Sequence, residues 1–125
     1  MTAEGFPRNA LFVCFGCMSN VGMLTGLAGL EVLQGLPEGE AGIFCLSGLA
    51  TEAPLVMKKT GLAERIIAVD GCALNCALKI LEAAGFSPDV RINLVEDCGI
   101  KKGKPFTQSE DELDIAVSAI REALG

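Results

Sequence analysis

Residues 65–85 read RIIAVDGCALNCALKILEAAG, and this stretch combines the two patterns that decide the fold. The run at 65–69 is apolar and rich in β-branched residues, as expected for a strand that is buried on both faces of a parallel sheet. The run at 73–84 has helical spacing, Gly85 follows it, and Pro88 prevents its continuation. A buried strand followed directly by a helix is typical of α/β proteins.

Helix signals also follow the other apolar runs of the chain. The expected helices run from a Ser19 or Asn20 cap to about Gln34, from a Thr51 cap to about Gly61, and onward from a capping box of Ser109 and Glu112. Gly22, Gly26 and Gly29 lower the helix propensity of the first of these. We therefore expect close packing against a neighbouring segment at these glycines.

Further strands are expected at residues 10–15, 41–46 and 90–95. Strands that alternate with helices are joined by right-handed crossovers into a parallel sheet. We predict an α/β fold in which residues 1–125 form a single three-layer domain, with a four-stranded parallel sheet in the order 2-1-3-4 and helices on both faces. In such a sheet the ligand crevice lies at the carboxyl ends of the strands, where the strand order reverses. This point falls between the first and third strands.

The chain has six cysteines and no histidine, and the cysteines follow the expected strands. Cys14 and Cys45 lie at the ends of the first and second expected strands, Cys72 and Cys98 follow the third and fourth, and Cys17 and Cys76 add a second thiol after the first and third. A single cysteine is often only a small buried hydrophobic residue. Six cysteines at strand ends instead favour a shared thiolate site at one edge of the sheet.

Cys72 and Cys76 are four residues apart at the expected start of the helix at 73–84, so we expect them on one face of its first turn. The positive end of a helix favours thiolates, and Cys17 has the same relation to the first helix. Asp70 is a hydrogen-bond acceptor for a capping amide, a residue that supports a metal ligand from behind, or a plain turn residue.

A donor set made only of thiols suits Zn²⁺, Cu⁺, an iron–sulfur cluster or another thiophilic metal. We expect a metal site formed from a set of five cysteines. They are Cys14, Cys17, Cys45, Cys72 and Cys76. Zinc is the leading metal, and the expected role is non-catalytic, in an accessory or handling function.

The residues argue against two enzyme classes and leave a third kind of protein as the alternative. A phosphate-loop phosphatase needs an arginine six residues after its cysteine, but Asn20 follows Cys14 at this spacing and Met23 follows Cys17. A Cys–His nucleophile needs a histidine, which the sequence lacks. A thiol redox protein, or a sulfur or metalloid carrier, that uses Cys14 and Cys17 is the alternative function. It leaves the other cysteines unexplained.

The net charge of −6 argues against a nucleic-acid partner, and the lysines at 101, 102 and 104 are first interpreted as a solvated loop. Residues 9–30 are uncharged, but Ser19 and Asn20 divide them, so we expect no membrane span. The opening residues MTAEGFPRNA lack a signal-peptide pattern. We therefore expect a cytoplasmic protein, with reduced thiols free to bind metal.

The chain resembles the DGC-domain family of zinc-binding proteins, which is named for the triplet Asp70-Gly71-Cys72. The likeness extends over most of the chain and includes VDGCALNCALKILE at 69–82, together with segments at 19–22, 45–48 and 99–102. The resemblance implies that the chelating positions of the family fall on Cys14, Cys45, Cys72 and Cys76. The first turn is one residue longer than in the family and adds Cys17, so either Cys17 or Cys45 completes the ligand set. Cys98 is also additional to the family pattern.

Overall fold

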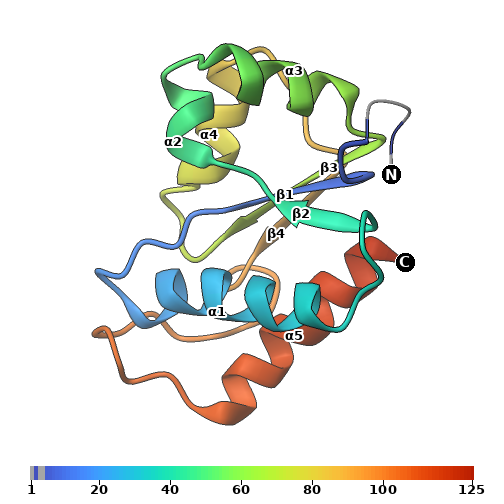
Figure 1. Ribbon diagram of the computed structural model, residues 1–125. Coiled ribbons are helices and arrows are strands. Elements are labelled where there is room, and N and C mark those ends of the chain that lie inside the picture. Colours follow the sequence, from blue (N-terminus) through green and yellow to red (C-terminus); the bar gives the residue numbers. More distant parts are fainter. Residues whose placement is uncertain (1, 3–4) are drawn as a thin grey trace.

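Four strands form one parallel sheet at the centre of the structure, a computed structural model that describes residues 2 and 5–125 (Figure 1). They are β1 (Asn9–Val13), β2 (Ala41–Ile43), β3 (Arg65–Asp70) and β4 (Val90–Asn93). The order across the sheet is β2-β1-β3-β4, and every pair is parallel, which confirms the predicted topology. β1 and β3 form the central pair, with register positions from Asn9↔Arg65 to Val13↔Val69.

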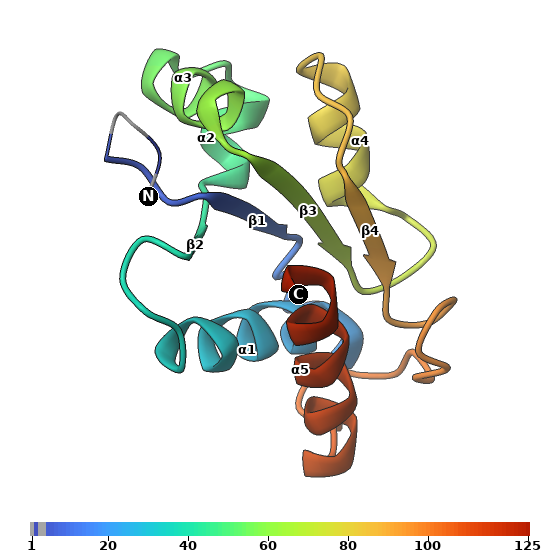
Figure 2. The same cartoon turned by 90° about the vertical axis from the view of Figure 1, so that its right-hand side faces the viewer.

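Helices cover both faces of this sheet, as predicted. The described residues form α1 (Asn20–Gln34), α2 (Leu46–Ala50), α3 (Pro54–Leu62), α4 (Cys76–Ala83) and α5 (Glu110–Leu124). α1 and α5 lie on one face, and α2, α3 and α4 lie on the other (Figures 1 and 2). Within the described residues, no helix combines the length and the apolar character needed to cross a membrane.

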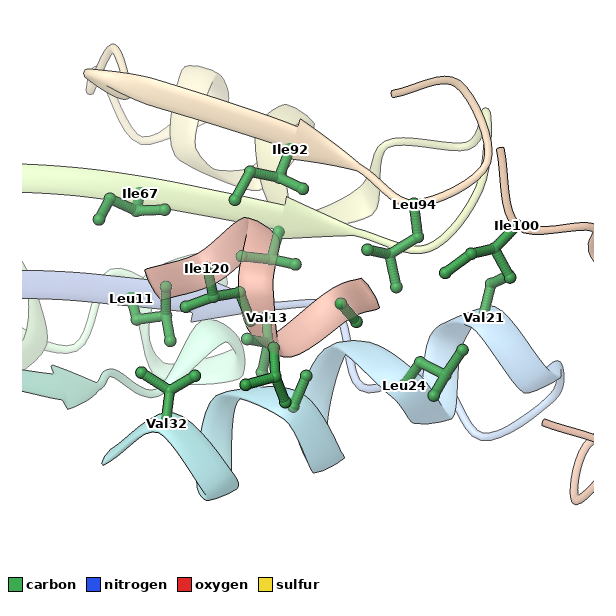
Figure 3. Close-up of a cluster of buried hydrophobic side chains, with 14 residues drawn as sticks. Leu11, Val13, Val21, Leu24, Val32, Ile67, Ile92, Leu94, Ile100 and Ile120 are labelled. Carbon is green, nitrogen blue, oxygen red and sulfur yellow. The ribbon is translucent and has the colours of Figure 1, made fainter. Parts of the chain in front are cut away.

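Alternate residues of β1 build two separate hydrophobic clusters, because successive side chains of a strand point to opposite faces. Leu11 and Val13 belong to the cluster beneath α1 and α5, which also contains Leu24 and Ile120 (Figure 3). Phe12 belongs to the cluster on the opposite face of the sheet. Burial of each such side chain stabilises the folded state by about 1.5–3 kcal/mol. Side chains of β1 therefore help to hold both layers of helices against the sheet.

The glycines of α1 lie at close contacts, as the sequence predicted. A Cβ atom at Gly22 would overlap the backbone carbonyl group of Gly16, and one at Gly26 would overlap the ring of Phe15. The loop after β1 therefore lies directly against the first two turns of α1, and only a residue without a side chain fits at these positions.

Two predicted caps are confirmed. The Ser19 hydroxyl accepts the backbone N–H of Gly22 at 3.1 Å at the start of α1. At the start of α5, Ser109 and Glu112 form the reciprocal capping box.

Several predicted boundaries are wrong. Thr51 does not begin a helix, because it ends α2, a short helix that the sequence analysis missed. Pro54 instead begins α3, where its missing N–H costs no hydrogen bond, and Gly61 lies inside that helix. β2 and β4 also stop short of the predicted 46 and 95, at Ile43 and Asn93.

The helix predicted at 73–84 begins at Cys76. Cys72 therefore precedes the helix, and the expectation that both thiols share its first turn is wrong. Asn75, at the N-cap, has a φ of 50°, and this left-handed residue separates the loop from the helix.

Candidate functional site

Three cysteines line one cavity of about 290 Å³ at the carboxyl ends of β1 and β3. Cys14 directly follows β1, Cys72 follows β3 by two residues, and Cys76 is the first residue of α4. This is the switch point at which a ligand crevice was predicted. The remaining wall consists of Gly16, Met18, Ser19, Gly22, Gly71, Leu74 and Lys102.

Cys14 is held by an extension of the central strand pair. Its N–H donates to the carbonyl of Val69 at 3.1 Å, and its Sγ lies 3.6 Å from the Thr25 hydroxyl. Thr25 is fully buried, accepts the N–H of Phe15 at 2.9 Å and donates to the carbonyl of Gly22 at 2.8 Å. Thr25 thus fixes the turn that carries Cys14, a role the sequence analysis did not assign.

Asp70 positions Cys76 by capping α4 from the end of β3. One carboxylate oxygen accepts the N–H of Ala77 at 2.7 Å, and the other accepts the N–H of Leu78 at 3.0 Å. Asn75 stands at the N-cap without a side-chain cap hydrogen bond, so Asp70 satisfies these amides in its place. Burial raises the pKa of Asp70, while the two amides oppose that rise. Of the three interpretations of Asp70, the capping one is confirmed.

Asn93 holds the loop that presents Cys72. Its side-chain N–H donates to the carbonyl of Cys72 at 2.8 Å and to the Oδ1 of Asn75 at 2.9 Å. Its own Oδ1 accepts the amides of Val95 and Glu96. In the sequence, Asn93 was only one polar residue of an alternating strand pattern, so nothing local to it indicated this role.

Lys102 places a positive charge beside Cys72. Its Nζ donates to the Cys72 Sγ at 3.5 Å. The loop of Lys102 is tied to α1 by Asn20, whose side chain donates to the carbonyl of Lys101 at 2.9 Å and accepts the N–H of Gly103 at 2.6 Å. The interpretation of Lys102 as part of a solvated loop was therefore incomplete. Lys102 and Cys72 are 30 positions apart in the chain, and only the tertiary structure brings them together.

Cys45 and Cys17 do not line the cavity. Cys45 caps α2, where its Sγ accepts the N–H of Gly48 at 3.3 Å and lies 3.4 Å from the Ser47 hydroxyl. The hydroxyl of Ser47 and then the amide of Gly48 lower the pKa of the Cys45 thiol. Cys17 is exposed, and its Sγ lies 3.7 Å from the Phe15 carbonyl oxygen.

Cys98 lies apart from the other thiols, beyond the edge strand β4. It lines an open groove with residues that include Arg91, Asp97 and Glu122. Burial and then the charge of Asp97 raise the pKa of the Cys98 thiol. A substitution of Cys98 is therefore a suitable control for substitutions of the cysteines that line the cavity.

The gathered thiols are not arranged as a ready coordination shell. In the described part of the chain, no three Cys, Asp or Glu side chains stand in an arrangement that could hold a metal ion. The chemistry of the cavity nevertheless fits a soft cation, since its potential donors are thiols from three positions.

Comparison with known proteins adds two findings. A family model described as the DGC domain matches residues 10–120. The chain is also 29% identical over 96 residues to the anaerobic and virulence modulator AnvM of Pseudomonas aeruginosa, a match that covers 77% of this chain and 70% of that protein. No solved structure matches the chain.

Proposed function

Because this chain belongs to the DGC domain family, we propose that it binds a soft metal ion, with zinc as the first candidate, through the thiolates of Cys14, Cys72 and Cys76. The observation that carries the proposal is the presence of these three thiols on one cavity at the switch point of the sheet. Zinc bound by cysteine thiolates is typically four-coordinate, with Zn–S distances of about 2.3 Å.

The surroundings of the cavity support this assignment. Three cavity thiolates and the fourth thiolate proposed below carry two more negative charges than a divalent cation neutralises, and the ammonium of Lys102 offsets one of them from its position beside Cys72. Asp70 and Asn93 hold Cys76 and the Cys72 loop from the sheet, so the ligand positions rest on rigid elements.

Cys45 is the fourth ligand in this proposal. It follows β2, the neighbour of β1 in the sheet, and its pKa is lowered, which favours the thiolate that metal binding requires. Cys17 is the competing candidate, and single substitutions distinguish the two. Loss of the true fourth ligand weakens zinc binding at least ~10-fold, the scale of a lost outer-shell partner, whereas loss of the other has a mild effect.

The proposed role is an accessory or metal-handling one in the cytoplasm, without catalysis. The word "modulator" in the name of the AnvM relative is in keeping with an accessory role.

Elemental analysis tests the proposal on protein purified without added metal, with thiols counted before and after denaturation in chelator. We expect about one zinc per chain and about four thiols that react only after chelation. Metal-free protein with a reversible Cys14–Cys17 disulfide would instead support the thiol redox function.

A further inference from the structure

We propose that the mouth of the thiol cavity is a docking surface for an acidic partner protein. The surface consists of Met18, Leu74 and Lys102, which line the cavity, together with Lys101 and Lys104, which are exposed beside Lys102 in the chain, and we refer to it as the basic rim. The proposal rests on surface chemistry and holds whether or not the cavity binds a metal.

Two apolar side chains of the basic rim are turned to solvent. Met18 is 93% exposed and Leu74 is 60% exposed, although both also line the cavity. Each is a flexible or branched apolar side chain beside a concave surface, and exposed apolar residues grouped in this way are typical of protein-interaction sites.

The charge of the basic rim is opposite to that of the whole chain. The net charge is −6, yet three of the ten basic residues stand at 101, 102 and 104. Asn20 holds their loop through hydrogen bonds to the backbone on both sides of Lys102, so the segment that carries these lysines is kept beside α1. Charge complementarity therefore selects an acidic partner, and it increases the rate at which such a partner associates.

A protein fits this surface better than a nucleic acid does. The acidic remainder of the chain repels a polyanion that extends past the basic rim. Met18 and Leu74 offer apolar contact area, which an acidic peptide with leucine side chains can cover. A partner bound here closes the cavity above Cys72, because Leu74 and Lys102 belong to the cavity wall.

NMR titration of the full chain with three probes tests the proposal. The first probe is a short synthetic peptide of Asp, Glu and Leu, the second has Ser in place of each Leu, and the third is an oligothymidylate of equal charge. We expect the Leu peptide to shift amide signals at residues 16–22, 72–76 and 101–104, and to bind at least ~5-fold more tightly than the other two.

Substitutions with matched controls locate the binding. Leu74→Ser, and the double substitution of Lys101→Gln with Lys104→Gln, should each weaken binding of the Leu peptide at least ~5-fold. Leu55→Ser removes a side chain of α3 that is 63% exposed, and Lys58→Gln with Lys79→Gln removes two exposed charges elsewhere. Both controls should change the affinity less than ~2-fold.

Several results would overturn the proposal. Shifts confined to other surfaces, or no saturable binding of the Leu peptide, would show that the basic rim does not dock such a partner. Equal binding of the Ser peptide would show that charge alone causes the binding and that the apolar side chains do not contribute. Stronger binding of the oligothymidylate would show that the basic rim binds nucleic acid and not a protein. Met18→Ser provides a second apolar variant in case Leu74→Ser fails to fold.

Discussion

The carboxylate of Asp70 lies 2.7 Å from the backbone nitrogen of Ala77, and this hydrogen bond joins the end of β3 to the first turn of α4. It gives a physical role to the first residue of the Asp70-Gly71-Cys72 triplet. Gly71 has a second role, since a Cβ there would lie 2.7 Å from the carbonyl carbon of Val21, in the first turn of α1. Cys72 supplies the thiol. The three residues of the triplet thus have three roles: Asp70 caps α4, Gly71 allows close contact with the backbone of α1, and Cys72 provides a thiol.

Asp70→Ala should lower the free energy of unfolding by about 2–4 kcal/mol, because it leaves two amides of α4 without their acceptor in a buried site. Urea denaturation followed by circular dichroism measures this. Asp114→Ala removes an exposed acidic side chain of α5 and should change the stability by less than about 0.5 kcal/mol. Equal losses in the two variants would show that the capping role is wrong.

Gly22→Ala should destabilise the protein by more than about 2 kcal/mol, because the added methyl group overlaps the backbone of Gly16 and backbone atoms cannot move aside cheaply. Gly16→Ala is the matched control, since a Cβ there meets nothing within 4 Å. Thermal unfolding compares the two. The tight packing of the β1–α1 loop would be refuted by a Gly22→Ala protein as stable as Gly16→Ala.

Alkylation of the metal-free protein should separate Cys45 from Cys98 by pH. The pKa of Cys45 is lowered, so its reactive thiolate forms at a lower pH than that of an ordinary cysteine. The pKa of Cys98 is raised, so its thiolate forms at a higher pH. Iodoacetamide labelling across a pH series, read by mass spectrometry of the peptides, should give the lower midpoint for Cys45. The reverse order would contradict the hydrogen bonds described for Cys45. Ser47→Ala should move the Cys45 midpoint upward and leave that of Cys98 unchanged.

Removal of metal by a chelator should lower the melting temperature without unfolding the protein at room temperature. The proposed ligands come from separate segments of the chain, so a metal bound by them would add stability by linking them. The two hydrophobic clusters form around the sheet without it, unlike the core of a zinc finger. Circular dichroism before and after chelation measures both effects. An unchanged melting temperature after proven metal loss, or complete unfolding, would contradict this.

The strand order and the presence of cysteines at the carboxyl ends of β1 and β3 could be predicted from the sequence because they depend on regular patterns. Apolar runs that alternate with helical ones imply a parallel sheet, and the cysteines follow the runs. The start of α4 was mispredicted because 73–75 have ordinary helical composition, whereas the structure depends on Asp70 and on the left-handed Asn75. The contacts of Lys102 and Asn93 with Cys72 join residues distant in the chain, so no local pattern indicated them.

The most direct test of the proposed metal site is a competitive chelator titration that compares zinc binding by Cys72→Ser and Cys98→Ser proteins. We expect at least ~10-fold weaker zinc affinity for Cys72→Ser and unchanged affinity for Cys98→Ser, because Cys72 lines the cavity and Cys98 lies beyond β4. Full zinc affinity in the Cys72→Ser protein, with loss of binding in the Cys98→Ser protein, would contradict the proposed site.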